Sequence, residues 1–193
     1  MKPDFHKYFP LRTGRVHEAC GHSALSFAFA LAGQLSGPVM WAREAWQSDH
    51  INPAGVLQYC DPHKLLVAKG NDQIDVLAIA EEALRSGAVA LTVIELNKPI
   101  GLTEGRRLQL AAKAGKSTGL CILPEGMGSN AAETRWQCIS IFDPTDSTQQ
   151  RWKLIKNKSG TLSMWDVRWD AKTHRIIVVS ETGKRPVSQD APH

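Results

Sequence analysis

The chain has 193 residues, of which 42% are hydrophobic and 22% are charged, with a formal net charge of +4. This length and composition predict one domain with a sizeable core and exclude an intrinsically disordered chain. No apolar run approaches the roughly 18 to 20 residues that span a bilayer, so we expect no membrane contact. No apolar segment follows the charged N-terminus, so we expect no secretory signal and a cytoplasmic protein.

Predicted strands and helices alternate after a short N-terminal arm at residues 1–13. Residues 15–20 form an apolar strand, and Ser23 is suited to cap the helix that follows it. Asp72 and Gly87 are suited to begin and end a longer helix. Three- and four-residue spacing in that helix predicts a buried face made of Ile74, Leu77, Ala80 and Leu84. The remaining predicted strands are at residues 38–42, 65–68, 88–94 and 118–123, and the remaining helices are at 53–59 and 103–114.

The predicted strands are apolar on both faces and alternate with helices, which indicates a mainly parallel central sheet flanked by helices. Beyond residue 130 four strand candidates follow without helices, at residues 134–141, 151–155, 162–169 and 174–180. In the third, Trp165, Val167 and Trp169 alternate with polar residues, and this period of two predicts antiparallel C-terminal strands. The fold class is therefore α/β, and we expect residues 183–193, which are polar, to form a disordered tail.

A phosphate-binding loop, G-x-x-x-x-G-K-[ST], is missing from the chain. Gly115-Lys116-Ser117 lacks the first glycine of the pattern and lies between a helix and a strand, so we interpret Gly115 as a helix C-cap. The expected strand–turn–helix context occurs at residues 18–26, where the turn Gly21-His22-Ser23 has no lysine. We therefore expect no ATP binding, and we interpret Ser23 as a helix cap rather than a magnesium ligand.

Other chemical signals are weak. The four cysteines form no C-x-x-C pair, no G-x-S-x-G motif occurs, and His17 within the first strand is interpreted as a structural histidine. Glu95 ends a strand at the edge where α/β sheets bind ligands, so it is either a ligand-binding carboxylate or an exposed strand-end residue. The sequence thus predicts no catalytic residue, no metal and no cofactor, and hence a protein that is not an enzyme.

A family resemblance is carried by the segments Gly14-Arg-Val-His-Glu-Ala, Glu82-Ala-Leu-Arg-Ser-Gly-Ala, Leu102-Thr-Glu-Gly-Arg-Arg and Thr134-Arg-Trp. Their order and spacing resemble the RecA family and, more closely, the ImuA family of RecA-related proteins encoded in bacterial mutagenic repair operons. The resemblance implies a RecA-like domain at residues 14–182 in which the phosphate-loop region has degenerated. That region comprises Gly14, Glu18, Gly21, His22 and Ser23.

The same resemblance places Glu95 at the end of the Walker-B-like strand, where RecA has an aspartate. Aligned without gaps, the position of RecA's catalytic glutamate falls on Arg43, with Glu44 one place along. The segments that hold single-stranded DNA in RecA correspond to residues 96–102 and 124–130, which contain one cation, Lys98, and no aromatic platform. ATP hydrolysis and RecA-style filaments on DNA are therefore not expected.

The resemblance implies a non-enzymatic accessory protein of the SOS response to DNA damage, active in translesion synthesis. Its expected partners are RecA and ImuB, a Y-family polymerase relative, and a homo-oligomer is a further expectation. The candidate partner-binding residues are Arg106, Arg107, Arg135 and Trp136. Three alternatives remain: an FtsZ-binding division inhibitor of the SulA branch, a nucleotide-binding enzyme that uses Glu95, and a weak DNA contact through residues 151–185, which hold nine Lys or Arg and three acids.

Overall fold

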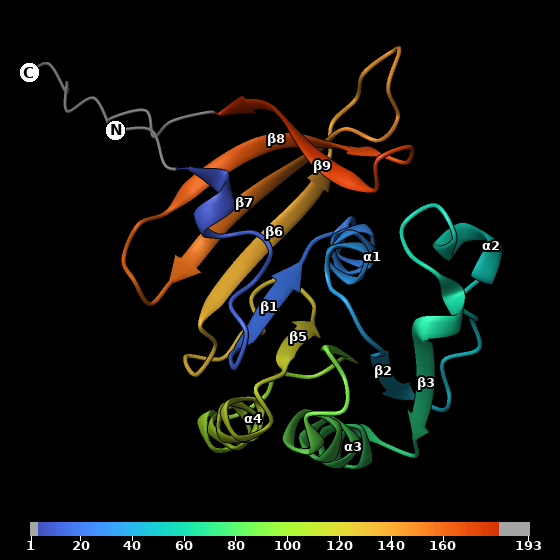
Figure 1. Cartoon of the computed structure of the whole chain (residues 1–193). Helices are drawn as coiled ribbons and strands as arrows, with labels where there is room; N and C mark the ends of the chain where they lie inside the picture. The colour runs from blue at the N-terminus through green and yellow to red at the C-terminus, as the bar shows by residue number, and fades with distance from the viewer. Residues whose placement is uncertain (1–3, 182–193) are drawn as a thin grey trace, which may run out of the picture.

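The computed structural model describes residues 4–181, which build one nine-stranded sheet with helices on both faces (Figure 1). The strand order is β3-β2-β4-β5-β1-β6-β7-β8-β9. Pairing is parallel from β3 to β6 and antiparallel from β6 to β9, as the sequence predicted. The strands are β1 (Val16–Cys20), β2 (Val39–Glu44), β3 (Leu65–Gly70), β4 (Leu91–Glu95), β5 (Thr118–Ile122), β6 (Thr134–Ser140), β7 (Gln150–Asn157), β8 (Ser163–Asp170) and β9 (Arg175–Glu181). The predicted tail at 183–193 lies outside the described residues.

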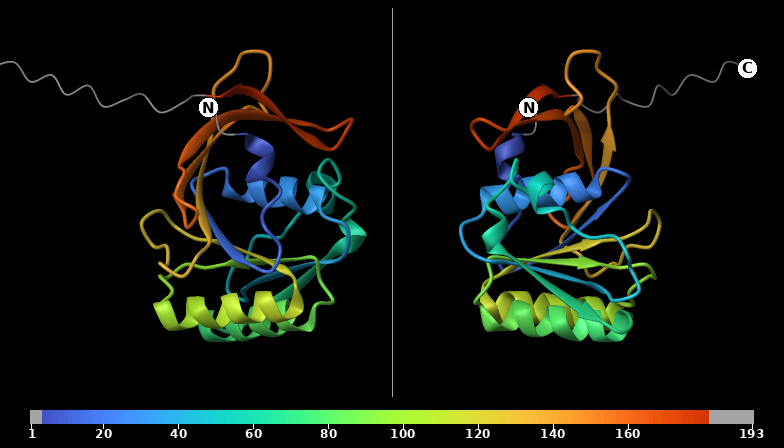
Figure 2. Two further views of the ribbon diagram at one scale, coloured as in Figure 1. Left: turned by 60° about the vertical axis from the view of Figure 1, so that its left-hand side comes forward. Right: turned by 90° about the vertical axis from the view of Figure 1, so that its right-hand side faces the viewer.

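Helices pack on opposite faces of the sheet, with α1 on one face and α3 and α4 on the other (Figure 2). Helices were expected to cover both faces of every parallel strand, but the edge strand β3 is not fully covered. Its neighbouring residues Leu66 and Val67 are 48% and 49% exposed. The helices are α1 (Ala24–Gln34), α2 (Pro53–Val56), α3 (Gln73–Ser86) and α4 (Leu102–Gly115), with single 3-10 turns η1 (Phe5–Lys7) and η2 (Pro62–Lys64).

The ends of α3 follow the predicted signals. The Asp72 side chain accepts a hydrogen bond from the Asp75 N–H at 3.0 Å, and Gly87 ends the helix in the left-handed conformation. The predicted burial of Ile74 is wrong, because its position at the start of α3 leaves it 76% exposed.

The prediction that Gly115 caps α4 is also wrong. Gly115 is the last residue of the helix, and Lys116 takes the left-handed cap conformation with φ 51°. A Cβ atom at Gly115 would overlap the carbonyl oxygen of Leu84 in α3. The glycine therefore permits close contact between the ends of α3 and α4, which is a packing role that spacing along the chain does not indicate.

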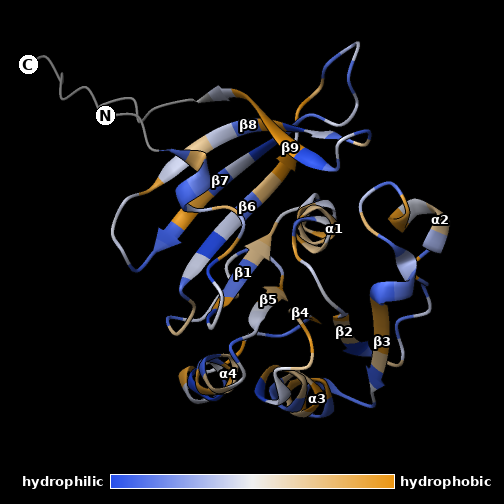
Figure 3. Cartoon of the chain, viewed as in Figure 1, coloured by the Kyte–Doolittle hydropathy of each residue, from blue (hydrophilic) through white to orange (hydrophobic). Residues whose placement is uncertain are grey.

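The larger hydrophobic core lies between α1 and the late strands, which curl over it (Figure 2). Trp136, Trp152, Trp165 and Trp169 all point into this core and are at most 5% exposed, which confirms the period of two predicted for β8. The segment predicted as an N-terminal arm adds apolar side chains to the same core, namely Phe5, Phe9 and Leu11. In Figure 3 α1 carries mostly apolar colours, whereas α3 and α4 carry both hydrophilic and hydrophobic colours.

His17 in β1 is a buried structural histidine, as predicted. Its Nε2 lies 3.0 Å from the Arg12 carbonyl oxygen, which can only accept, so Nε2 carries the proton. Its Nδ1 then accepts from the Thr134 hydroxyl at 2.7 Å, and the Thr134 hydroxyl oxygen accepts from the Trp136 indole at 2.9 Å. Burial of the ring lowers the pKa of His17 from 6.5 to about 4.

We expect the free energy of unfolding to fall by about 2 kcal/mol between about pH 7 and pH 5 because of His17. In that range the unfolded chain binds a proton at His17 and the folded chain, whose His17 has the lower pKa of about 4, does not. Urea unfolding at each pH measures the change. His17→Gln should flatten this dependence, whereas His63→Gln, at an exposed histidine, should not; an equal slope in wild type and His17→Gln would contradict the prediction.

Candidate functional site

The turn between β1 and α1, where a phosphate loop would lie, is closed by the end of β6. The Ser23 N–H donates to the Cys138 carbonyl at 3.1 Å, and the Ser140 N–H donates to His22 Nε2 at 2.9 Å. The hydroxyls of Ser23 and Ser140 are 2.9 Å apart. These bonds engage the N–H and the hydroxyl of Ser23, two polar groups that a nucleotide phosphate would need.

The structure differs from two predictions about this turn, namely the capping role of Ser23 and the inclusion of Gly14. Ser23 stands at the N-cap position of α1, but its side chain makes no capping bond because its hydroxyl pairs with Ser140 instead. Gly21 has φ 90°, and a Cβ atom there would overlap the Cys138 carbonyl oxygen. Gly14 is not part of the turn: it precedes β1 at the opposite edge of the sheet, where its N–H donates to the Ser117 carbonyl at 2.9 Å.

Glu18 and Arg135 form an ion pair beneath the turn. The Glu18 side chain is 1% exposed, and its Oε2 lies 2.6 Å from Nε of Arg135, which is 20% exposed. The Ser129 N–H donates to the Glu18 carboxylate at 2.8 Å, and the Arg135 guanidinium donates to the Ser129 carbonyl at 2.9 Å. The pair thus fixes the segment before β6 against β1, and Arg135 is committed to it rather than free for a partner. The predicted partner contact of Trp136 is wrong, because the side chain is 0% exposed.

Glu95 at the end of β4 forms an ion pair with Arg43 at the end of β2. The Glu95 carboxylate lies 3.2 Å from the Arg43 guanidinium and accepts a hydrogen bond from the Trp41 indole N–H. Arg43 is 5% exposed and also lies 3.2 Å from the Asp49 carboxylate. Glu95 is therefore neither an exposed strand-end residue nor a free ligand, because Arg43 neutralises its charge.

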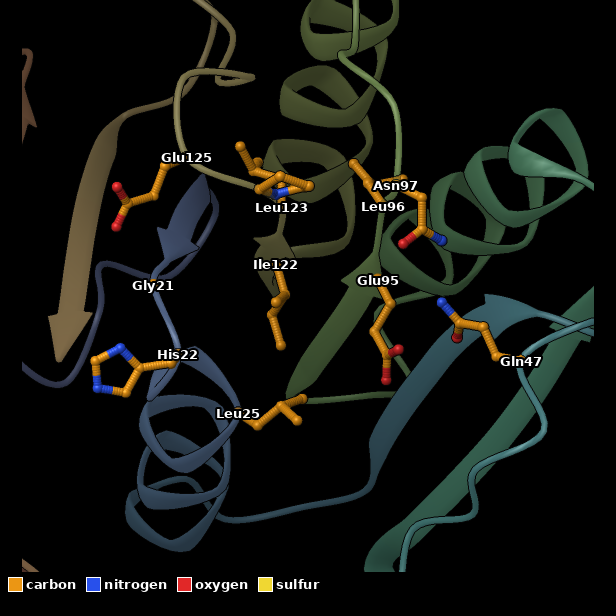
Figure 4. Close-up of a pocket in the computed structure, with 11 residues that line it drawn as sticks. Gly21, His22, Leu25, Gln47, Glu95, Leu96, Asn97, Ile122, Leu123 and Glu125 are labelled. Atoms are coloured by element: carbon orange, nitrogen blue, oxygen red, sulfur yellow. The ribbon is translucent and has the colours of Figure 1, made fainter. Parts of the chain in front are cut away.

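Two neighbouring cavities lie along this edge of the sheet. The first, about 480 Å³, is lined by the β1–α1 turn, by β4 and by the residues after β5, with the side chains of Glu95 and Ile122 directed toward it and the Glu125 carboxylate turned toward β6 (Figure 4). The second, about 340 Å³, lies between α1 and residues 49–59. Both cavities are lined by Leu25 and Glu95, and Arg43 is the one Lys or Arg that lines either. A polyphosphate would meet carboxylates there, without an exposed cation to balance its charge.

Arg106 and Arg107 lie in the first half of α4, which packs with α3 on the face of the sheet opposite α1 (Figure 2). Both are exposed, and Arg107 pairs with Glu81 of α3 at 2.7 Å. Leu110, one turn further along α4, is 67% exposed. The structure therefore does not gather the predicted partner-binding arginines with the degenerate loop.

The outer face of the late strands holds basic residues. Arg151 pairs with Asp166 across β7 and β8 at 2.6 Å, and the tryptophans of β6, β7 and β8 all face the core. Within residues 4–181, these tryptophans therefore do not offer the outer face a stacking platform of the kind that proteins use for single-stranded nucleic acid.

The sequence interpretation missed the residues between β2 and α2. Trp46 is 65% exposed, and its indole donates to Glu44, while Gln47 and Asp49 bond to Arg43. A tryptophan within a polar loop that follows a strand was the available signal. The described residues contain no cluster suited to a metal ion, and none of their helices combines the length and apolar character of a membrane span.

Comparison with known proteins first defines the class. No family model matches the chain. The structure resembles the crystal structure of the RadB recombinase with a TM-score of 0.63, covering 86% of this chain and 90% of that chain at 13% identity. The fold is therefore RecA-like, as the sequence predicted.

Sequence comparison then identifies the relatives. The chain is 28% identical over 182 residues to Protein ImuA of Caulobacter vibrioides, in strain NA1000 and in strain ATCC 19089 alike. The match covers 84% of this chain and 71% of each relative. The chain is therefore similar in sequence to ImuA, which confirms the family resemblance predicted from the sequence.

Proposed function

We propose that this chain is a non-enzymatic accessory protein of mutagenic DNA repair that works in translesion synthesis by contacting other proteins. The proposed partners are RecA and the ImuB-type polymerase relative. The main observation in support of a non-enzymatic role is that the end of β6 closes the β1–α1 turn, where His22 and Ser23 form hydrogen bonds with Ser140. The relation to ImuA supports the role in mutagenic repair.

Each part that nucleotide hydrolysis requires is missing or already engaged. The turn has no lysine to balance phosphate charge, and the polar groups of Ser23 bond to β6. Glu95, which ends the strand that carries the metal-binding carboxylate in such sites, is paired with Arg43. Phosphoryl transfer depends on positioned cations and a bound metal ion, and these residues offer neither an exposed cation nor an unpaired carboxylate.

We expect no ATP binding. Isothermal titration with ATP and magnesium at millimolar concentrations should show no saturable heat, and the thermal midpoint should not rise, because a ligand that binds the folded state raises it. Saturable heat that disappears in Glu95→Gln would contradict the proposal and locate the nucleotide at this edge. ATP-dependent release of phosphate by the wild-type protein would contradict the non-enzymatic role directly.

The outer face of α4 is the proposed contact surface for a repair partner. Arg106 is exposed and has no ion-pair partner within residues 4–181, and Leu110 one turn later exposes 67% of its surface. An arginine beside an exposed apolar side chain is typical of the residues that dominate protein interfaces. The three residues Arg106, Arg107 and Leu110 are here called the α4 face.

Charge reversal of the α4 face, Arg106→Glu with Arg107→Glu, is expected to reduce capture of RecA and the ImuB-type protein by about tenfold. The measurement is a pull-down of the tagged protein from its own DNA-damaged cells, with bound proteins quantified by mass spectrometry. Lys172→Glu, a reversal at an exposed lysine in the turn between β8 and β9, is the control outside the α4 face and should capture normally. Because Arg107 pairs with Glu81, thermal melting checks that the variant remains folded.

The same experiment separates the proposed function from its alternatives. Undiminished capture by the double variant would remove the α4 face from the proposal. Recovery of FtsZ without RecA or the ImuB-type protein would place the chain in division control instead. Binding to single-stranded DNA that weakens steeply with salt would favour the DNA-contact alternative.

A further inference from the structure

We propose that the edge groove, formed by the two cavities that share Leu25 and Glu95, binds a partner segment in which an apolar side chain lies next to a lysine or arginine. The groove follows the carboxyl ends of the parallel strands, on the side of the closed β1–α1 turn (Figure 4). The inference rests on the proposed function, since it gives the chemistry of one protein contact, and none of the residues that line the groove belongs to the α4 face.

The second cavity provides an apolar pocket with fixed walls. Leu25 of α1 is 47% exposed there, and Phe29, Ile51 and Tyr59 line the same cavity. The Phe29 ring stacks on Trp41 at 4.8 Å and on Tyr59 at 5.9 Å between ring centroids, so the wall is rigid. A volume of about 340 Å³ falls at the lower end of ligand sites and suits one aromatic or branched side chain.

The charges along the groove favour a cation over an anion. Its carboxylates are Asp49, Glu95 and Glu125, and Asp49 has 82% of its side chain exposed. The cation that lines it, Arg43, is 5% exposed and pairs with both Asp49 and Glu95. The Asp49 pKa is lowered by its own backbone N–H and by Arg43, so the group is charged at neutral pH. A lysine or arginine can therefore approach Asp49 from solvent, whereas a phosphate or an acidic peptide is repelled.

Exposed apolar side chains extend the surface beyond the cavities. Trp46, 65% exposed, precedes Gln47 of the first cavity, and its indole N–H donates to Glu44. Leu57, 61% exposed, stands between Val56 and Gln58, which both line the second cavity. Large exposed apolar residues around a polar-edged pocket mark binding sites for proteins, and tryptophan is prominent among their anchors.

The test is selection of short random peptides displayed on phage against the full chain, followed by fluorescence polarisation with the selected peptides. We expect enrichment of peptides that carry an aromatic residue or leucine close to a lysine or arginine. Asp49→Lys is expected to weaken the binding of these peptides by about tenfold or more, and Leu25→Ser should weaken it as well. Glu82→Lys reverses a carboxylate of similar exposure on α3, outside the groove, and should leave binding unchanged.

Each other outcome overturns the proposal. Enrichment of acidic peptides, failure to enrich any peptide, or equal binding by wild type and Asp49→Lys would each show that the groove does not select a basic segment. The proposed function is judged separately, by capture of RecA and the ImuB-type protein from damaged cells. Normal capture by Asp49→Lys would retain the function and reject the groove, whereas peptide selectivity without capture would retain the groove and reject the function.

Discussion

Replacing Arg135 by Met, or Glu18 by Leu, is expected to lower the free energy of unfolding by about 3–5 kcal/mol, whereas replacing both together should recover most of that loss. Each single change leaves one charge without its partner at 2.6 Å. The Glu18 side chain is 1% exposed, so water cannot replace the arginine. The double variant removes both charges and fills the site with apolar groups of similar size.

Urea unfolding of the two single variants and the double variant measures the coupling between Glu18 and Arg135. The matched control is the Arg151–Asp166 pair, which has the same 2.6 Å separation but a 34% exposed arginine. Because water screens that pair, Arg151→Met should cost about 1 kcal/mol or less. Losses that simply add in the Glu18/Arg135 double variant would contradict the coupling. A partner-binding role for Arg135 would instead appear as lost capture without lost stability.

Gly21→Ala is expected to destabilise the fold by about 4 kcal/mol. About 1 kcal/mol comes from holding alanine at φ 90°, and the rest, about 3 kcal/mol, from overlap of the new methyl group with the Cys138 carbonyl. Since β6 is held against β1 through the Glu18–Arg135 pair and the ladder, the backbone cannot move away without breaking other bonds.

Gly126→Ala is the matched control for Gly21→Ala. Gly126 has a similar φ of 83°, but a Cβ atom there would meet nothing within 4 Å, so only the conformational cost of about 1 kcal/mol is expected. Thermal and urea unfolding compare the two variants. Equal losses in both would show that the close approach of Cys138 is unimportant, and hence that the turn is not held shut by β6.

Local patterns were sufficient to predict most of the fold. The apolar runs in β2, β4 and β5 predicted these strands, and the alternation of Trp165, Val167 and Trp169 predicted a strand buried on one face, because both patterns reflect burial within a few residues. The same alternation in β6 buries Trp136, and that burial excludes it as a partner contact. Gly115 was misinterpreted because the atom that requires a glycine there belongs to Leu84, in another helix.

The candidate site was predicted only in part. The missing lysine and the short turn are visible in residues 21–23, so the loss of the phosphate loop could be read directly from the chain. Closure of that turn could not, because Ser140 lies 118 positions from His22. The pairing of Arg43 with Glu95 likewise joins strands that are neighbours only in the folded sheet. The sequence shows which residues are polar, but which of them form hydrogen bonds or ion pairs with one another depends on tertiary packing.

The central position of β1 has a consequence for synthesis of the chain. β1 precedes both of its partners in the sheet, β5 and β6, by about a hundred residues, so it has no strand to pair with until that length of chain has followed it out of the ribosome. The contacts of Phe5 span a still longer part of the chain, since its ring packs against Trp152 and Trp165. Contacts of such long sequence separation form slowly. During synthesis β1 therefore stays without its strand partners while about a hundred residues are added, and a chain released before β8 leaves the ring of Phe5 without its Trp165 contact.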